Sequence, residues 1–505
     1  MSIISLEFFI FTILTLIIYY IIPKRARWVL LLIASAVFYL AASELMYLVF
    51  AGMTLLAWGG CLLMQRLKEK RRLIVTTMII SKVMILITFN NTFFIDNTNF
   101  IMAHFFPGYE PFPYPAWVVP LGISYFTLIL ISYTLDVYWG ISESQRNPLK
   151  LLLFAGYFPQ LVTGPFTRYK DMKSQLFESK SFSFEQVCFG LQRIVWGLFK
   201  KLIMAERLNV IVSTIYGCSD TYTGTYIFVG AFSFVLQLYI DFSSSMDIII
   251  GVSQLFGIVL PENFRTPFYS LNLSEFWRRW HITLGLWLKD YVLYPLLKSR
   301  LFVRLKKSCK RLWGKKAAQK IPTYCGMFIT WFCIGFWHGG SWRFIFGSGL
   351  FFFIMIVGGL ILEPVFKWMI ALLRINTQTF SWILFQRIRT FILFMMSVSF
   401  IRAESLMAGF RMWRSAFTVF NPWVLFDGSL FDLGLDANNF FVMVFGLIIL
   451  FLVSYMQQSG SIRKRLANQN LVFRWAIFIG VTMAVLIFGM YGAEYEVTDF
   501  IYGQF

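Results

Sequence analysis

The sequence predicts an all-α polytopic membrane protein, and three observations support this fold class. Of its 505 residues, 58% are hydrophobic and only 14% are charged, whereas about a quarter of the residues in a soluble domain are charged. Apolar runs of about 20 residues, the length that spans a bilayer as a helix, recur along the chain. The 45 Lys and Arg residues outnumber the 25 Asp and Glu residues, which gives a formal net charge of +20. Lys and Arg cluster between the apolar runs, as in cytoplasmic loops. We therefore expect membrane lipid around the protein and no binding of nucleic acid.

A single domain, residues 1–505, is expected to contain roughly a dozen membrane helices. The candidate spans, in chain order, are 7–22, 28–42, 45–64, 73–90, 118–138, 186–212, 225–256, 323–337, 342–362, 382–400, 439–457 and 472–492. Two shorter apolar segments, 151–163 and 284–297, carry proline or charge, and we expect them to be re-entrant or interfacial. Such segments are tolerated at membrane depth only where protein or a water-filled cavity surrounds them, so they mark a site.

The distribution of basic residues predicts the side of the membrane on which each connecting segment lies. The first apolar run, 8–22, is followed rather than preceded by positive charges, so we expect a retained helix with an extracytoplasmic N-terminus. No Lys or Arg occurs between residues 82 and 146, or between 414 and 463, which predicts extracytoplasmic loops. Residues 298–320 hold ten basic residues and no acidic one, which predicts a cytoplasmic loop. The tail, 493–505, is then expected on the extracytoplasmic side.

The sequence contains no pattern typical of a metal site or of a bound cofactor. Its six cysteines include no CxxC pair, so neither a disulfide framework nor a zinc site is expected. Histidine clusters with metal-ligand spacing, a Walker loop and a GxSxG elbow are also absent. We therefore expect side chains and the substrate itself to carry the chemistry.

Two of the three histidines, His281 and His338, lie in apolar surroundings rich in Trp, where a polar ring needs a partner or a function. Glycines follow His338 and allow backbone or a ligand to approach it closely. The pattern is equally compatible with a packing role and a catalytic role for His338, and it favours packing for His281. The candidate supporting residues are Asp241, Glu275, Trp337 and Arg278.

Several carboxylates also fall near membrane depth. Asp241 and Asp247 lie about 120° apart around a helix, so they need not form a pair. Other carboxylates lie near helix ends. For these, the pattern is equally compatible with ion pairs to basic residues nearby in the sequence and with a functional role. The carboxylates concerned are Asp136, Glu262, Glu275 and Asp290, and the basic residues are Arg265, Arg278 and Lys289.

Seven segments in a fixed order carry a resemblance to a known family. They are PLGISYFTLILISYTLDVYWG, FPQLVTGPFTRY, GLFKKLIMAERL, LQLYIDFSSSMD, LFGIVLPENFRTPF, EFWRRWHITLGLWLKDY and GFWHGGSW. Over most of its length the chain resembles the membrane-bound O-acyltransferase (MBOAT) superfamily. The resemblance is to its bacterial branch, which contains alginate O-acetylases, peptidoglycan O-acetyltransferases and the teichoic-acid D-alanylation membrane protein.

The resemblance implies a funnel-shaped helical core in which His338 is the catalytic residue and His281 lies nearby. It also implies transfer of an acyl group from a thioester, acetyl-CoA or an acyl carrier protein, to a hydroxyl. Because a neutral imidazole suits removal of the hydroxyl proton, we expect His338 to be the general base. His281 or backbone N–H groups near Gly339 and Gly340 are then candidates for stabilising the oxyanion.

The tail FIYGQF resembles a C-terminal motif whose tyrosine, here Tyr502, is an acyl acceptor. The implied route runs from a cytoplasmic thioester to Tyr502, then to an extracytoplasmic SGNH-like or related O-acyltransferase, and then to an envelope polysaccharide. A bacterial cytoplasmic membrane is the implied location. A tyrosine that only anchors the tail at the membrane interface is the alternative.

Two departures from the family pattern leave the polymer open. Ser244, Ser245 and Met246 stand where alginate-type members commonly have Gly-Tyr-Ser, and Gly503 occupies a usually aromatic position. We therefore expect peptidoglycan or an exopolysaccharide as the acceptor, without assigning alginate. D-alanyl transfer to teichoic acid is the alternative among enzymes. A transporter and a non-catalytic scaffold are the alternatives from other classes, since intramembrane histidines and carboxylates also mark ion pathways.

Overall fold

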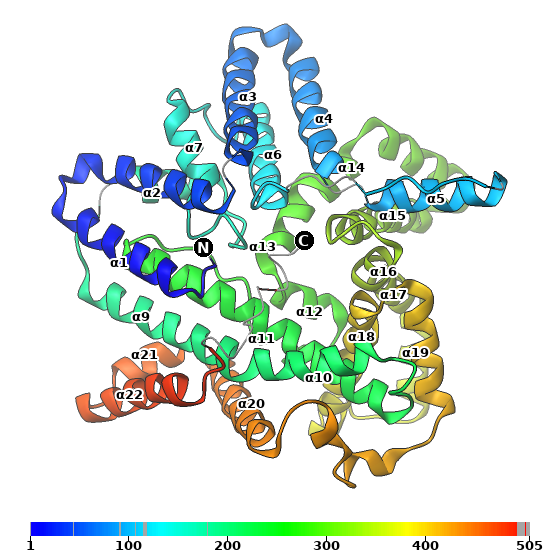
Figure 1. Ribbon diagram of the computed structural model, residues 1–505. Coiled ribbons are helices and arrows are strands. Elements are labelled where there is room, and N and C mark those ends of the chain that lie inside the picture. The colour runs from blue at the N-terminus through cyan, green and yellow to red at the C-terminus, as the bar shows by residue number, and fades with distance from the viewer. Residues whose placement is uncertain are drawn as a thin grey trace.

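The computed structural model describes residues 2–43, 45–89, 92–106, 108–114, 119–178, 180–491 and 500. These described residues form helices and loops and no β-strand, which confirms the predicted all-α fold. Figure 1 shows the helices arranged as a broad ring around three central elements. These are α11 (Thr225–Leu255), α12 (Leu273–Arg279) and α13 (Ile282–Leu288).

Eight helices of the described chain are long and apolar enough to cross a membrane, judged by length and composition. They contain α2 (Arg27–Ala42), α3 (Met46–Arg66), α4 (Arg71–Phe89), α11, α17 (Phe351–Leu372), α18 (Phe380–Arg402), α20 (Ala437–Gln457) and α22 (Leu471–Phe488). Two shorter apolar helices, α1 (Leu6–Ile21) and α6 (Ile123–Trp139), complete the set. All ten coincide with predicted spans.

Two other predicted spans have a different character. The span at 186–212 is a continuous helical segment that changes its winding twice, as α9 (Phe184–Phe199), the π-helix η3 (Lys200–Ala205) and α10 (Glu206–Gly217). It buries charged side chains, among them Lys200 and Lys201. The span at 323–337 is the second half of a long helix, α15 (Arg300–Trp337).

The basic segment 298–320, predicted as a loop, is mostly helical, and the loop prediction was wrong. Most of it forms the first half of α15, which begins at Arg300 after Ser299, whose side chain accepts a hydrogen bond from the Phe302 N–H. Lys, Arg, Leu and Ala, which dominate the segment, are among the strongest helix formers, so its charge does not prevent a helix. Gly314, with φ of +83°, produces a kink partway along.

The two segments predicted to be re-entrant or interfacial are short, interrupted helices. They correspond to α7 (Pro148–Gly156) and to the series α13, η5 (Lys289–Leu293) and α14 (Tyr294–Lys298). A helix of nine residues rises about 14 Å, which is less than the bilayer core of about 30 Å. Neither α7 nor α13 therefore spans a membrane by itself.

The remaining elements connect these helices and cover their ends. The helices are α5 (Thr92–Phe105), α8 (Tyr169–Phe177), α16 (Trp342–Phe344), η6 (Ile345–Leu350), α19 (Leu406–Thr418) and α21 (Ile462–Ala467). The single turns of 3-10 helix are η1 (Lys24–Ala26), η2 (Lys68–Lys70), η4 (Pro267–Tyr269), η7 (Pro422–Leu425) and η8 (Ser429–Asp432).

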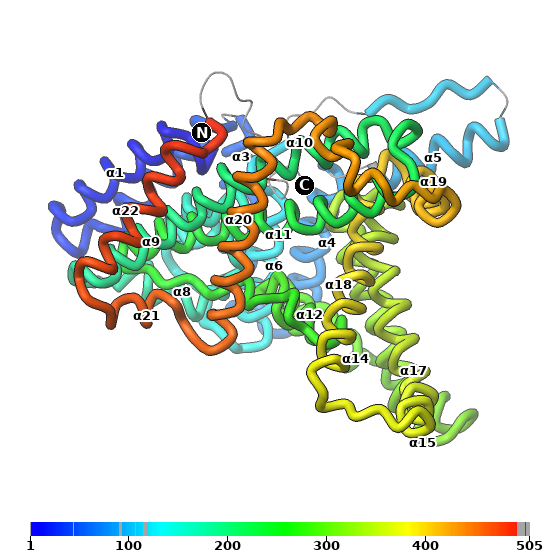
Figure 2. Tube along the Cα trace, turned by 90° about the horizontal axis from the view of Figure 1, so that it is seen from below, coloured from blue at the N-terminus to red at the C-terminus, as the bar shows by residue number. Residues whose placement is uncertain are grey.

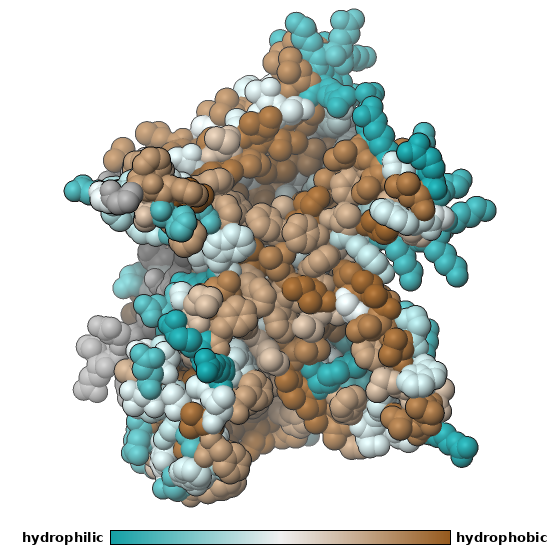
Figure 3. Space-filling view, turned by 90° about the vertical axis from the view of Figure 1, so that its right-hand side faces the viewer, coloured by the Kyte–Doolittle hydropathy of each residue, from teal (hydrophilic) through white to brown (hydrophobic). Residues whose placement is uncertain are grey.

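The segments predicted to lie on opposite sides of the membrane lie at opposite edges of the molecule. Figure 2 shows α5 and α19 at the upper edge, and α21, α14 and part of α15 toward the lower edge. The face in Figure 3 is hydrophobic and hollowed in its middle, with hydrophilic side chains gathered at its margins. This arrangement fits a protein surrounded by lipid. Which edge faces the cytoplasm stays a prediction from the sequence.

The helix α11 forms the centre of the core and packs closely on α9. A Cβ atom at Gly251 of α11 would lie 2.7 Å from the Gly190 carbonyl oxygen, and one at Gly197 would lie 2.9 Å from the Ser244 carbonyl oxygen. Small residues at such contacts let two membrane helices approach backbone to backbone. The close contact fixes the position of α11, from which several walls of the site below project.

Candidate functional site

His338 lies where α15 ends and the chain turns back. It is the C-cap of the helix, and its backbone N–H donates to the Ile334 carbonyl at 3.0 Å. The next two residues, Gly339 and Gly340, have φ of +143° and +71°. A Cβ atom at position 339 would lie 2.8 Å from the Phe344 ring, so the turn requires glycine. The turn thus fixes His338, only 6% exposed, at a helix end inside the bundle.

The side chain of His338 lines a small, mostly apolar cavity of about 20 Å³. The other walls come from α11, the α12 region, α16, η6, α17 and α18, and consist of Leu238, Trp277, Trp280, Phe344, Ser348, Phe352, Phe394, Val398 and Ile401. Apolar walls exclude water, and electrostatic interactions are stronger in such a site than in solution.

His281 lies between α12 and α13 in the left-handed region, with φ of +44°. Its Nδ1 is 3.2 Å from Oδ1 of Asn263. The imidazole stacks on Phe166 and packs against the edge of Phe242, with ring centroids 6.0 and 4.8 Å apart. The side chain is 4% exposed and lines a second cavity, of about 40 Å³, together with Ser124 among others. Contacts on several sides therefore hold the ring.

Trp337 brings the two histidines into one site. Its ring centroid lies 4.8 Å from that of His338 and 6.5 Å from that of His281. Trp337 also lines the His281 cavity. Three of the residues singled out from the sequence therefore lie together, although α12 and α15 are separated by several other elements.

A larger cavity of about 810 Å³, called the vestibule below, shares one lining residue with each histidine cavity. Ser124 lines the vestibule and the His281 cavity, and Phe344 lines the vestibule and the His338 cavity. Its remaining described walls are Phe89, Asp96, Val119, Ile123, Gly339, Ser341, Trp342, Arg343, Glu404, Ser405, Leu406 and Met407. Because α5 and α19 contribute to these walls, the vestibule lies toward the upper edge of the molecule in Figure 2.

The site is suited to proton transfer in a pocket with restricted access to water. Two imidazoles line cavities that share lining residues with a vestibule large enough for a small organic substrate, and imidazole is the side chain most often used as a general base. Within the described ranges, no three His, Cys, Asp or Glu side chains are grouped as potential metal ligands.

The other candidate residues lie apart from the two histidine cavities. Asp241 forms a buried ion pair with Lys201, with the two atoms 2.8 Å apart. Glu275 pairs with Arg279 at 2.6 Å, and Arg278 is exposed. None of Asp241, Glu275 and Arg278 is among the described residues that line either cavity. Their supporting role stays a prediction, and the cavity geometry adds no support to it.

The expected ion-pair partners were wrong for three carboxylates. Glu262 pairs with Arg193 and Asp290 with Arg168, while Glu275 pairs with Arg279 rather than with Arg278. Asp136 accepts a hydrogen bond from the Tyr291 hydroxyl at 2.9 Å. Tertiary contacts between distant helices decided the partners in all but the Glu275 pair, and proximity in the sequence does not report such contacts.

A network of charges, mostly buried apart from Glu262, joins α9, η3 and α11 to the loop after α11, and it was not predicted. Arg193 pairs with Asp247 at 2.7 Å and with Glu262 at 2.5 Å, and Lys200 pairs with Asp247 at 2.7 Å. All four line a third cavity, of about 90 Å³, together with Asn263. Two consecutive lysines in the apolar segment GLFKKLIMAERL are the sequence signal for this network, because charges at membrane depth are tolerated mainly when they are paired.

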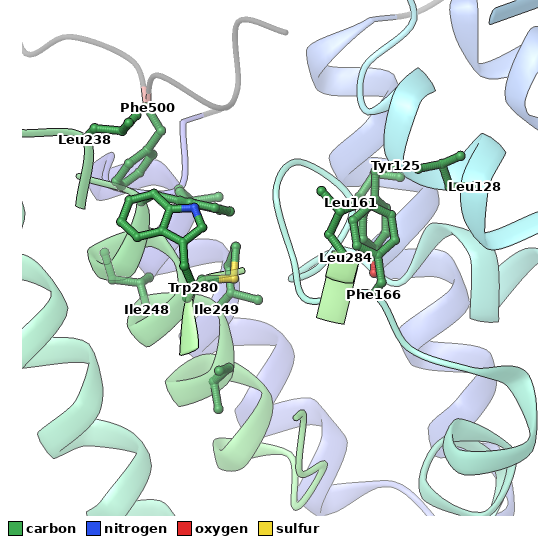
Figure 4. Close-up of a cluster of buried hydrophobic side chains, with 14 of the residues drawn as sticks. Tyr125, Leu128, Leu161, Phe166, Leu238, Ile248, Ile249, Trp280, Leu284 and Phe500 are labelled. Carbon is green, nitrogen blue, oxygen red and sulfur yellow. The ribbon is translucent and has the colours of Figure 1, made fainter. Parts of the chain in front are cut away.

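Phe500 lies in the core, which the sequence did not predict. Tyr502 lies outside the described residues, but Phe500 is described and is 3% exposed. Its ring centroid is 4.7 Å from the Lys201 ammonium. Figure 4 shows Phe500 beside Leu238 and Trp280, and both of these residues line the His338 cavity.

Comparison with known proteins supports the resemblance seen in the motifs. A model of the membrane-bound O-acyltransferase family (MBOAT) matches residues 74–403. The chain is 31% identical over 425 residues to a probable alginate O-acetylase AlgI of Azotobacter vinelandii, covering 83% of this chain and 78% of that protein. It is 30% identical to a peptidoglycan O-acetyltransferase of Helicobacter pylori, covering 50% and 49% of the two chains. A teichoic acid D-alanyltransferase of Bacillus subtilis is 29% identical, with 45% and 55% covered.

Proposed function

The chain belongs to the membrane-bound O-acyltransferase family, and we propose that it passes an acetyl group from a cytoplasmic thioester across the membrane for O-acetylation of an extracytoplasmic envelope polysaccharide. The enzyme class follows from the family and disfavours the transporter and the scaffold considered from the sequence. Acetyl is proposed because the alginate and peptidoglycan relatives are named as O-acetylating enzymes. D-alanyl transfer, named for another relative, is the alternative.

The proposed reaction uses His338 as general base and needs no bound cofactor. The imidazole takes the proton of an attacking hydroxyl, the hydroxyl oxygen forms a bond to the thioester carbonyl carbon, and the carbon–sulfur bond breaks. The departing thiolate then receives the proton from the imidazolium. A general base contributes about 10² to 10⁴ in rate, so positioning of the reactants must supply much of the remainder. The contact of His338 with Trp337 and the mostly apolar cavity around it support this role.

The first acceptor in this proposal is the hydroxyl of Tyr502, in the C-terminal tail of the same chain. The burial of Phe500 beside residues that line the His338 cavity is the observation that carries this step. Two residues of extended chain span at most about 7 Å, so Tyr502 is separated by only a short length of chain from a residue packed beside the walls of that cavity. The tail would then serve as an acyl carrier within the protein.

The final steps are proposed to take place on the extracytoplasmic side. A separate SGNH-like or related O-acyltransferase would take the acyl group from Tyr502 through the vestibule side and pass it to peptidoglycan or an exopolysaccharide. This proposal places both termini outside the cytoplasm, in the cytoplasmic membrane of a bacterium. On the opposite side, the basic first half of α15 would attract the phosphates of CoA or an acidic acyl carrier protein.

Radiolabelled acetyl-CoA tests the proposal on the purified full chain in nanodiscs. Wild type, His338→Ala and Tyr502→Phe are compared, and any label on the protein is mapped by mass spectrometry. We expect label on Tyr502 that depends on His338. Release of CoA with no label on Tyr502 would overturn the relay but keep the acyltransferase. If neither acetyl-CoA nor D-alanyl and acetyl carrier thioesters are cleaved, the proposed reaction is wrong.

A further inference from the structure

We propose that the His338 cavity is the acyl pocket of the enzyme and that its walls select acetyl. The indole N–H of Trp277 donates to the carbonyl oxygen of the thioester. The aliphatic side chains of Leu238, Val398 and Ile401 enclose the methyl group. This inference deepens the proposed function and rests on it for the reaction, and it decides between acetyl and D-alanyl, both of which occur in the names of the relatives.

The volume of the cavity limits the length of the acyl chain. A cavity needs about 10 to 15 Å³ to hold one water molecule, so a volume of about 20 Å³ accommodates a group of about one or two non-hydrogen atoms. A methyl group fits this space, whereas a propionyl or butyryl chain has to displace a wall. Leu238 of α11 and Val398 of α18 are 4% and 3% exposed, and closely packed side chains of this kind yield little.

The walls also disfavour an acyl group that carries a charge. Among the described residues that line the cavity there is no Asp, Glu, Lys or Arg. The Ser348 hydroxyl donates to the Phe344 carbonyl oxygen at 2.7 Å. A D-alanyl group carries an ammonium on its α-carbon, and an ammonium that is buried without a carboxylate is strongly disfavoured. The cavity therefore favours acetyl over D-alanyl.

A buried hydrogen-bond donor in the wall is suited to hold the thioester carbonyl. Trp277 lines the cavity, and its indole nitrogen is buried with no hydrogen-bond partner within the described ranges. The ring packs edge to face against Trp331 and Phe352, with centroids 5.0 and 4.9 Å away. Nearly all buried polar groups have a partner, so an exception calls for an explanation. A carbonyl oxygen, which accepts and cannot donate, would satisfy this N–H.

This donor and the proposed general base, His338, line the same cavity. When the acceptor oxygen bonds to the thioester carbon, the carbonyl oxygen gains negative charge, which it loses when the carbon–sulfur bond breaks. An N–H fixed beforehand stabilises that charge more strongly in the transition state than in the thioester. Trp277 is then a catalytic residue, and its hydrogen bond holds the acyl group with the methyl among the aliphatic walls.

Thioesters that differ only in the acyl group test the size and charge limits. The purified full chain in nanodiscs receives acetyl, propionyl, butyryl or D-alanyl groups, each on CoA and on an acyl carrier protein, and release of the thiol is measured. We expect kcat/KM to fall by about tenfold or more from acetyl to propionyl, as for one methylene too many in an apolar pocket. The D-alanyl thioesters should not be cleaved.

The outcomes separate this inference from the proposed function. Similar kcat/KM for acetyl and propionyl, or cleavage of D-alanyl thioesters at a rate similar to that of acetyl, would overturn the acyl pocket and keep the acyltransferase. Cleavage of none of the thioesters would overturn the proposed reaction, and the acyl pocket with it.

Val398→Ala tests the wall that limits the chain. The substitution removes two methyl groups beside the cavity, so we expect the ratio of propionyl to acetyl kcat/KM to rise by about tenfold. This ratio does not depend on the amount of folded protein. Ile392→Ala, at an exposed position of the same helix, is the matched control and should keep the wild-type ratio. An unchanged ratio in Val398→Ala would overturn the assignment of this wall.

Trp277→Phe tests the donor, because it removes the N–H and keeps an aromatic ring. We expect kcat to fall by about 100-fold, as for the loss of one oxyanion donor, and KM to stay within about threefold. Trp331→Phe is the matched control, since it makes the same exchange in a ring that contacts Trp277 and is not among the described residues lining the cavity. It should keep the wild-type kcat. Equal losses in the two variants, or a wild-type kcat in Trp277→Phe, would overturn the role of Trp277.

Discussion

The ammonium of Lys201 lies 4.7 Å from the centre of the Phe500 ring, so a residue of the central helices contacts one that is distant from it in the sequence. Lys201 also pairs with Asp241 at 2.8 Å and with Glu206 at 2.7 Å. The π-helix η3, which carries Lys201, therefore presents a paired cation to an aromatic ring in the core. Cation–π contacts are worth about 2 kcal/mol or more when desolvated. The contact holds Phe500 in the core.

Phe500→Ala should slow acyl transfer to Tyr502 by about tenfold, because position 500 loses both its buried ring and its cation–π contact. Phe500→Tyr should keep most of the rate, since a phenol ring preserves the π-face. The measurement is the initial rate of Tyr502 labelling from acetyl-CoA. The matched control is Phe426→Ala, at a ring that is 87% exposed, for which no change is expected. Equal rates in Phe500→Ala and wild type would show that Phe500 does not position the tail.

Gly349→Ala should lower the thermal stability of the protein and reduce its activity about tenfold. The added Cβ atom would separate η6 from α15, the helix that ends at His338. A Cβ atom at Gly349 would lie 2.4 Å from the Trp331 carbonyl oxygen, and backbone atoms cannot yield as a flexible side chain can. Overpacking of this kind costs about 1 to 3 kcal/mol. Thermal unfolding and acyl transfer should both be measured.

Gly358→Ala provides the control for this prediction. An added Cβ atom there meets nothing within 4 Å, and alanine is favoured over glycine in a helix by about 1 kcal/mol. We expect wild-type or slightly higher stability and unchanged activity. A similar decrease in both variants would mean that the decrease at position 349 does not come from the helix contact.

Asp247→Leu should destabilise the protein by about 3 to 5 kcal/mol, because it leaves the buried Lys200 ammonium without its carboxylate, whereas Arg193 keeps its pair with Glu262. Asp247 pairs with both Arg193 and Lys200. Adding Lys200→Met should recover part of the loss, since it removes the charge that has lost its partner. Thermal unfolding in detergent measures both effects. The exposed pair of Glu363 and Lys367 supplies the control, Glu363→Gln, which should leave the unfolding temperature unchanged. A double variant no more stable than Asp247→Leu would argue against the charge-pairing explanation.

The fold was predictable because its signal is local. Apolar runs of sufficient length occur one after another, and each forms a helix whose position the structure reproduces, from α2 to α22. The helical angle between Asp241 and Asp247 was also enough to show that they need not pair, and the two have separate partners. The basic segment 298–320 was predicted to be a loop because its high charge argues against a membrane span. High charge does not argue against a helix, since Lys and Arg have high helix propensity.

The site was predictable only in part, because some of its residues are recognised by their type and others only by their tertiary contacts. His338 and His281 stand out because a polar ring is rare in apolar surroundings. Asn263 does not stand out, although its amide oxygen lies within hydrogen-bond distance of residues 281 and 283, because a sequence does not report the direction of a side chain. The anchoring of Phe500 by Lys201 is likewise a contact between distant segments.

Neutralising the exposed basic side chains of the first half of α15 should weaken binding of the acyl donor while leaving the chemical step unchanged. The variant carries Gln at Lys306, Lys307, Lys310 and Arg311, which are exposed and belong to a segment without acidic residues. Attraction of an anionic donor to such a patch acts over a distance and is screened by salt. We therefore expect KM for acetyl-CoA to rise several-fold at low ionic strength, kcat to stay within about twofold, and the salt dependence of KM to decrease.

Gln at Arg411 and Arg414, on the α19 side of the molecule, is the control and should leave KM unchanged. If KM keeps its value and its salt dependence in the α15 variant, the patch does not guide the donor, and its charge then serves to fix the orientation of the protein in the membrane.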